Sequence, residues 1–185
     1  MLAPTFPVSL PGARFIGTLL LSTSAGAAAN IVRVARWATH MQQWVFEHAI
    51  DCGVSIQFAW NFWTNVSNWV LDPDVDSIEI QGEFAAGTNG VTHSRSSGKI
   101  NWRITEVVQP CKAVIEFPAP GAVARFLWTF EDVDGRTRIS QQVSLSGEQV
   151  AMYVDKFSTG LRAGIPAGML KLCEAMQAAA RTSAK

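Results

Sequence analysis

The chain has 185 residues, which is enough for one well-buried core and short for two full domains. Apolar residues make up 48% of the chain and charged residues only 16%, which excludes a disordered polypeptide and requires much apolar surface to lie in a core or line a pocket. Fifteen basic residues balance fifteen acidic ones, so the positive excess typical of nucleic-acid binding is missing and no nucleic-acid partner is expected.

Residues 1–40 are interpreted as a leader that precedes the domain. The stretch from Phe15 to Ala29 is apolar, follows Arg14 and is too short to span a bilayer as a helix. Three interpretations stay open: a disordered or helical segment, an export signal, or a segment absent from the mature protein because translation begins at Met41. We expect a cytoplasmic protein without stable membrane insertion, with export as the alternative.

The first strand is predicted over Gln43–Ile50, in a stretch whose alternation continues to Cys52. One face carries Trp44, Phe46, His48 and Ile50, a period-two pattern typical of a strand. A helix with Ser55 as its N-cap is predicted next, ending near Asn65 to Trp69. Its apolar residues recur at spacings of three and four: Ile56, Ala59, Trp60, Trp63 and Val66.

Six further strands are predicted between turn signals. Their connections are short enough for hairpins, which indicates an antiparallel meander. The predicted ranges are Val75–Phe84, Thr88–Arg95, Lys99–Val108, Lys112–Phe117, Ala122–Asp132 and Arg136–Gly147.

A long amphipathic helix is predicted from Gln149 onward. Apolar residues from Val150 to Met176 follow one another at helical spacing. Proline lacks a backbone donor and clashes with the preceding turn, so a kink or a brief break is expected at Gly164 to Pro166.

The order of these elements resembles the helix-grip fold of the START-like superfamily (SRPBCC), which includes the polyketide cyclase/dehydrase and lipid-transport families. Two segments carry the resemblance, FAWNFWTNVSNWVLDPDVDSIEIQGEFAAGTNG and DGRTRISQQVSLSG. The resemblance implies an α+β domain over residues 41–182, in which a curved seven-stranded antiparallel sheet wraps around a long C-terminal helix. One departure is that VSIQFAWNFW lacks the Pro-Glu with which the family's helix often begins.

The inward-facing residues of the strands and the long helix are predicted to line a cavity for a hydrophobic ligand of drug-like size. Any one of them could equally be ordinary core. The predicted lining residues are Trp102, Ile104, Ile115, Phe117, Phe126, Trp128, Phe130, Gln141, Val143, Phe157, Leu161, Ile165 and Met169.

Polar candidates for the cavity are few. Gln141 interrupts an inward apolar stripe and needs a hydrogen-bond partner, which a ligand carbonyl, a neighbouring strand or a trapped water could supply. His93 and Arg95 share one face of a strand, pointing either into the cavity or into solvent.

The sequence gives no sign of other chemistry. The histidines form no metal-binding pattern, and no motif of an activated nucleophile occurs, so no metal, cofactor or catalytic residue is predicted. The cysteines, Cys52, Cys111 and Cys173, include no CxxC pair, which favours reduced, buried thiols.

The leading functional hypothesis is a monomer or weak homodimer that binds or transports a lipid, isoprenoid or aromatic metabolite. The alternatives are a polyketide cyclase/dehydratase-like enzyme that uses His93, Arg95 or Gln141, and an interaction domain like the chaperone-ATPase activators. The fold hosts all three classes, so it does not choose among them.

Overall fold

A computed structural model describes residues 44–183 of the chain. The predictions for residues 1–40, Met41 and Gln43 therefore lie outside the described residues. Within the described part, no helix is both long and apolar enough to cross a membrane.

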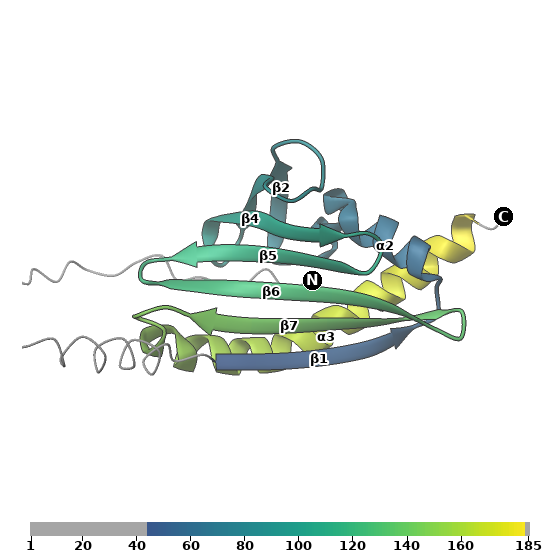
Figure 1. Cartoon of the computed structure of the whole chain (residues 1–185). Coiled ribbons are helices and arrows are strands. Elements are labelled where there is room, and N and C mark those ends of the chain that lie inside the picture. The colour runs from purple at the N-terminus through teal and green to yellow at the C-terminus, as the bar shows by residue number, and fades with distance from the viewer. Residues whose placement is uncertain (1–43, 184–185) are drawn as a thin grey trace, which may run out of the picture.

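Seven antiparallel strands form one sheet in the order β1-β7-β6-β5-β4-β3-β2, and a long helix lies behind it (Figure 1). The connections are hairpin-like from β2 to β7, and β1 joins the sheet beside β7. This confirms the predicted α+β helix-grip architecture. The strands are β1 (Trp44–Cys52), β2 (Val75–Ile80), β3 (Asn89–Ser94), β4 (Gly98–Val108), β5 (Lys112–Ala119), β6 (Ala122–Val133) and β7 (Arg136–Ser146).

The helical segment after β1 consists of two short helices rather than one. In α2 (Ile56–Thr64), the Ser55 hydroxyl accepts a hydrogen bond from the Phe58 backbone N–H at 3.4 Å, which confirms the predicted N-cap. The 3-10 helix η1 (Val66–Leu71) has its own cap, because Asn65 adopts an extended backbone and its side chain accepts from Ser67 N–H at 3.2 Å. A capping residue at Asn65 thus ends one helix and begins the next.

Strand β2 is shorter than the predicted Val75–Phe84. It ends at Ile80, and Gly82 follows with a φ of +113°, a conformation that takes the chain out of the extended region. Phe84 then packs its ring against Trp63 and Trp69, at centroid distances of 5.2 and 6.3 Å. The last residues of the predicted strand therefore do not extend the sheet, because Phe84 packs against α2 and η1 instead.

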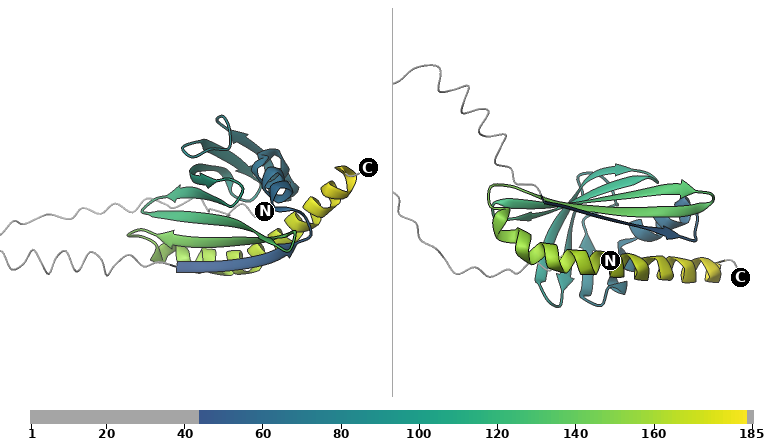
Figure 2. Two further views of the ribbon diagram at one scale, coloured as in Figure 1. Left: turned by 45° about the vertical axis from the view of Figure 1, so that its right-hand side comes forward. Right: turned by 90° about the horizontal axis from the view of Figure 1, so that it is seen from below.

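Helix α3 (Ala151–Ser183) is continuous through Pro166, so a brief break at Gly164 to Pro166, one of the two predicted forms, is wrong, and a kink there stays a prediction. Proline removes one backbone donor, but the helix extends far on both sides of it and its apolar face stays buried along its length. Packing therefore outweighs the local penalty. Figure 2 shows α3 running diagonally beneath the curved sheet, and its backbone comes close to β1 and α2.

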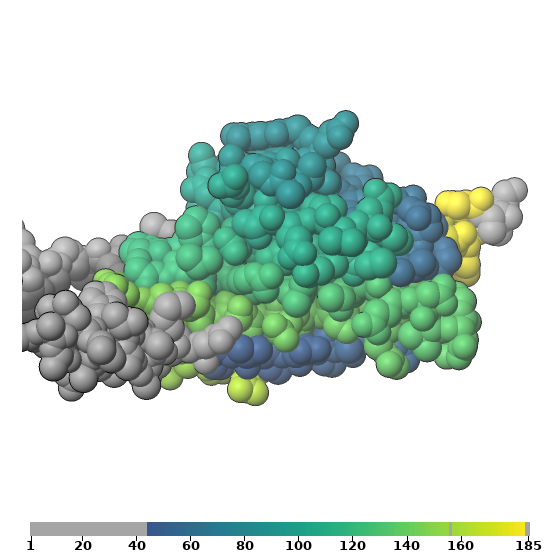
Figure 3. All heavy atoms as spheres, in the orientation of Figure 1, coloured from purple at the N-terminus to yellow at the C-terminus, as the bar shows by residue number. Residues whose placement is uncertain are grey.

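The core lies between α3 and the inner face of the sheet. Each strand alternates between a buried and a more exposed side, as in β6, where Ala124, Phe126, Trp128 and Phe130 are buried. From the opposite, outer side, the strands hide most of α3 (Figure 3). The inner face of the sheet is therefore the only side of these strands that meets the helix.

Gly90 on β3 lies directly under the indole of Trp102, and a Cβ at this position would come within 2.1 Å of the ring. We expect Gly90→Ala to lower the free energy of unfolding by about 1–3 kcal/mol, because the ring is buried and has no room to move. Chemical denaturation measures the change.

Gly160→Ala is the matched control, because Gly160 lies in α3 and a Cβ there meets nothing within 4 Å. Alanine should stabilise the helix at this position by roughly 0.5–1 kcal/mol. Two substitutions of the same chemistry should thus change the unfolding midpoint in opposite directions, and a stable Gly90→Ala variant would contradict the packing described.

Candidate ligand-binding interior

All of the predicted lining residues, from Trp102 on β4 to Met169 on α3, are buried. The burial confirms that these side chains face the interior. Their contact with a ligand stays a prediction, because burial is also what an ordinary core requires. Met152, at the start of α3, is 56% exposed and does not belong to this interior.

One end of the interior is filled by aromatic rings. Trp63 on α2 is at the centre of this cluster, within 5.2–6.0 Å of the rings of Trp60, Trp69, Trp128 and Phe130. Trp102 borders the cluster, and its indole N–H donates to the Thr92 hydroxyl at 3.0 Å. This aromatic cluster attaches α2 and η1 to the sheet, and Trp128 lies at its border with the middle of the interior.

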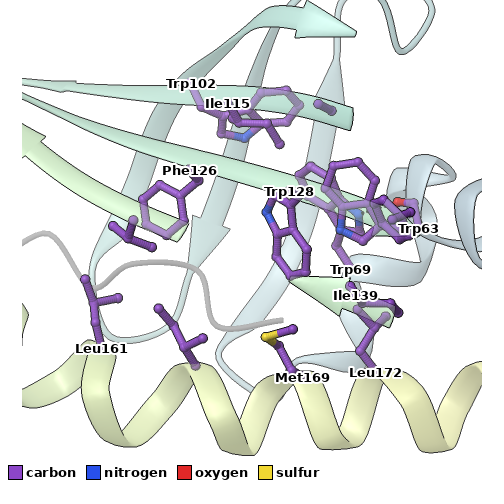
Figure 4. Close-up of a cluster of buried hydrophobic side chains, with 14 of the residues drawn as sticks. Trp63, Trp69, Trp102, Ile115, Phe126, Trp128, Ile139, Leu161, Met169 and Leu172 are labelled. Carbon is purple, nitrogen blue, oxygen red and sulfur yellow. Dashed lines mark hydrogen bonds between the residues drawn. The ribbon is translucent and has the colours of Figure 1, made fainter. Parts of the chain in front are cut away.

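The middle of the interior is built differently. Phe126 and Trp128 project from β6 toward Leu161 and Met169, which project from α3 (Figure 4). The backbone of α3 lies close to β1 and α2 but is held away from the central strands, so side chains alone span this space. A ligand that enters between sheet and helix would meet these four side chains.

A polar row crosses this middle region of the inner face. In the sheet register, Gln141 on β7 lies opposite Trp128 on β6 and opposite His48 on β1. Gln141 is only 4% exposed, and His48 is half-buried. The sequence identified Gln141 and Trp128 but not His48 as site residues. The position of His48 on one strand face with Trp44, Phe46 and Ile50 was the signal that could have identified it.

His93 and Arg95 do not join this region, so their placement inside a cavity is wrong and the solvent alternative holds. His93 lies 3.2 Å from a Glu79 oxygen, and Arg95 pairs with Asp76 at 2.6 Å, both at the exposed side of β2 and β3. Thr92 and Ser94 occupy the inner positions of β3 instead. The alternation of a strand permits only one of the two sets to face inward.

Charged side chains of β1 and β7 also lie on the outer face. Arg138 donates two hydrogen bonds to the carboxylate of Asp51, at 2.8 and 3.1 Å, and these bonds hold the pKa of Asp51 below its ordinary value. Glu47 accepts from Gln142 at 2.9 Å on the same side. The outer face is thus ionic, whereas the polar row inside consists of an indole, an amide and an imidazole.

Two of the three cysteines meet where β1 ends against α3. The Cys52 thiol donates to the backbone carbonyl of Cys173 at 3.6 Å, and burial, with a hydrogen bond to Cys173, raises the pKa of the Cys52 thiol. Cys111 is exposed, so the prediction of a buried thiol is wrong at this position. Among residues 44–183, no cluster of His, Cys, Asp or Glu could hold a metal ion.

The thiols should therefore differ in reactivity. At neutral pH a disulfide reagent such as DTNB should modify one thiol, Cys111, in the folded protein, because Cys52 and Cys173 are both buried and the pKa of the Cys52 thiol is raised. Unfolding should release all three. A Cys111→Ser variant should lose the fast phase, and fast reaction of two or more thiols in the native state would contradict the packing of α3 on β1.

Comparison with known proteins places the chain by its fold. No protein-family model matches it, and no curated protein matches it. Among solved structures, Ara h 8.0201 is 15% identical with a TM-score of 0.62, and the match covers 74% of this chain and 99% of that protein. Norcoclaurine synthase from Thalictrum flavum, solved with dopamine and hydroxybenzaldehyde, is 12% identical with a TM-score of 0.60. The match covers 87% of this chain and 97% of the synthase chain.

A third match is the di-domain ARO/CYC protein StfQ of the steffimycin biosynthetic pathway, 13% identical with a TM-score of 0.61. The match covers 86% of this chain and 62% of StfQ. These likenesses show that the chain has the helix-grip fold that the sequence predicts. At such low identity they do not transfer an activity.

Proposed function

We propose that this protein binds a hydrophobic small molecule between the inner face of its sheet and α3. The observation that carries the proposal is the middle region of the interior, where the α3 backbone stands away from the central strands and apolar side chains face one another across the space. Burial of apolar ligand surface against these side chains contributes roughly 25 cal/mol per Å² to the binding free energy, before the costs of association.

The lining side chains suit a flat or flexible apolar ligand. Phe126 and Trp128 offer ring faces, whereas Leu161 and Met169 offer adaptable aliphatic surface. An aromatic metabolite, an isoprenoid or a lipid would meet these needs. The norcoclaurine synthase structure supports the proposal by analogy, because that protein has the same fold and holds two small aromatic molecules.

The position of the charged residues favours binding over a cyclase-like reaction. Of the three groups that the enzyme alternative would use, His93 contacts Glu79 and Arg95 pairs with Asp76, both on the exposed far side of the sheet. Only Gln141 stays inside, and an amide does not exchange a proton at neutral pH.

Native mass spectrometry of the purified protein, with displacement of an anilinonaphthalene dye, tests the proposal. We expect either a co-purified ligand or dye binding in the micromolar range. Val143→Phe should weaken dye binding by about tenfold or more, because Val143 is fully buried between Phe46 and Phe126 and the added ring would occupy the ligand space.

Val45→Phe is the matched control, since Val45 lies on the outer face of β1 and is 46% exposed. It should leave dye binding unchanged. Near-ultraviolet circular dichroism establishes that both variants are folded. A folded Val143→Phe variant with full dye affinity, or a wild-type protein that binds neither ligand nor dye, would argue against the proposal.

A further inference from the structure

We propose that His48, Gln141 and Trp128 form a recognition row that selects apolar ligands carrying a neutral hydrogen-bond acceptor, such as a ketone carbonyl. This inference rests on the proposed function and specifies the ligand class. The row crosses three neighbouring strands at one level of the sheet.

The register of the sheet brings these three side chains together. Residues directly opposite each other in antiparallel strands have Cβ atoms about 4.5–5.5 Å apart and point to the same face. Gln141 has Trp128 on one side and His48 on the other, so its amide lies between an indole and an imidazole. Apolar rows flank it at both levels, one of Phe46, Val143 and Phe126 and one of Ile50, Ile139 and Phe130.

The hydrogen-bonding groups of the row are unused within the described residues. No side-chain hydrogen bond of Trp128, Gln141 or His48 occurs there, although Trp128 is 2% and Gln141 4% exposed. Two other buried polar groups in the same interior bond to protein atoms. Trp69 donates to the Trp63 carbonyl at 2.8 Å, and Thr137 donates to the Val54 carbonyl at 2.8 Å. The polar atoms of Trp128 and Gln141 are not among the fully enclosed ones, so they border space from which a partner outside the protein can approach.

The indole N–H of Trp63 differs from that of Trp128 in what surrounds it. Its N–H also lacks a partner, but Trp63 is completely buried within the aromatic cluster and has rings on several sides. In Figure 4 the indole nitrogen of Trp128 lies on the side of its ring away from Trp63, toward the middle of the interior. The Trp128 donor therefore faces the proposed ligand space, and the Trp63 donor does not.

The chemistry of the row defines the acceptor. An indole only donates, an amide donates through its nitrogen, and an imidazole donates in either tautomer through one nitrogen. A carbonyl oxygen has two lone pairs and can accept from two such donors at once. Asp132, at the exposed end of β6, is the one Lys, Arg, Asp or Glu residue on the inner side of β1, β6 and β7, and the buried inner positions of these strands carry none. A neutral carbonyl therefore fits better than a carboxylate.

One cation approaches this face from α3. Arg162 lies over the rings of Trp44 and Phe46, at 5.9 and 5.4 Å from their centroids, and its side chain is exposed. Its charge is delocalised over two aromatic faces and open to water, which weakens its attraction for a ligand anion. The experiment below includes an anionic probe for this reason.

Fluorenone and fluorene form a suitable pair of probes, because they have the same ring system and differ only in a carbonyl in place of a methylene group. Calorimetric or tryptophan-fluorescence titration of the wild-type protein should show about three- to tenfold tighter binding of fluorenone, the range expected for one or two added hydrogen bonds. Fluorene-9-carboxylate, the anionic probe, should bind more weakly than fluorenone.

Gln141→Leu should remove most of this preference by weakening fluorenone binding while leaving fluorene binding unchanged. Trp128→Phe should reduce the preference in part, since it keeps an aromatic ring and removes the donor. Gln142→Leu is the matched control, because Gln142 is the next residue on the outer face of β7 and bonds to Glu47. It should keep the wild-type preference.

Thermal unfolding without ligand gives an independent measurement. Gln141→Leu should raise the unfolding midpoint, because it replaces an amide that lies among apolar side chains without a protein partner with an apolar side chain of similar size. A lowered midpoint would show that the amide is already bonded and would overturn the inference. Gln141→Met serves as a second variant if the leucine does not fit.

The outcomes separate this inference from the proposed function. Equal binding of fluorene and fluorenone, tighter binding of the carboxylate, or an undiminished preference in Gln141→Leu would overturn the recognition row but leave ligand binding in place. Failure of the wild-type protein to bind any probe would overturn both.

Discussion

The packing of one long helix across the inner face of a curved sheet is the constraint on which the rest of this structure depends. The strands bury one side toward α3, α2 and η1, so most of their inward residues are apolar and most charged residues lie outside. Because α3 approaches β1 and α2 but stays away from the central strands, large side chains must fill the distance. The same geometry that makes the core therefore makes the space proposed for a ligand.

The interior is divided by how its polar groups are satisfied. At the end near α2, the indoles of Trp69 and Trp102 donate to protein oxygens, the Trp63 N–H is enclosed by rings without a partner, and rings contact rings, as expected of a rigid core. In the middle, Trp128 and Gln141 have no partner among the described residues. Stability is optimised at one end, and the middle carries unused hydrogen-bonding capacity, which is a common mark of a functional site.

The strands and the faces they present could be predicted from the sequence because period-two alternation is a local signal. The inward orientation of Phe126, Trp128 and Val143 follows from it directly. Three other features could not be predicted from the sequence: the boundaries at Gly82 and Asn65 and the continuity of α3 at Pro166. Packing against distant elements decides each of them. His93 and Arg95 show a further limit, since alternation gives two faces but does not say which one is inside.

The sequence by itself determined the class of fold, the order of its elements and the apolar stripes that α3 covers, because hydrophobic periodicity and turn residues act over short stretches of chain. Only the tertiary structure decided the sheet order and register. The order and register place His48 beside Gln141 and Trp128, which lie 93 and 80 positions further along the chain, respectively. Strand pairing between distant segments is set by the global packing of the sheet on the helix, and no local pattern contains it.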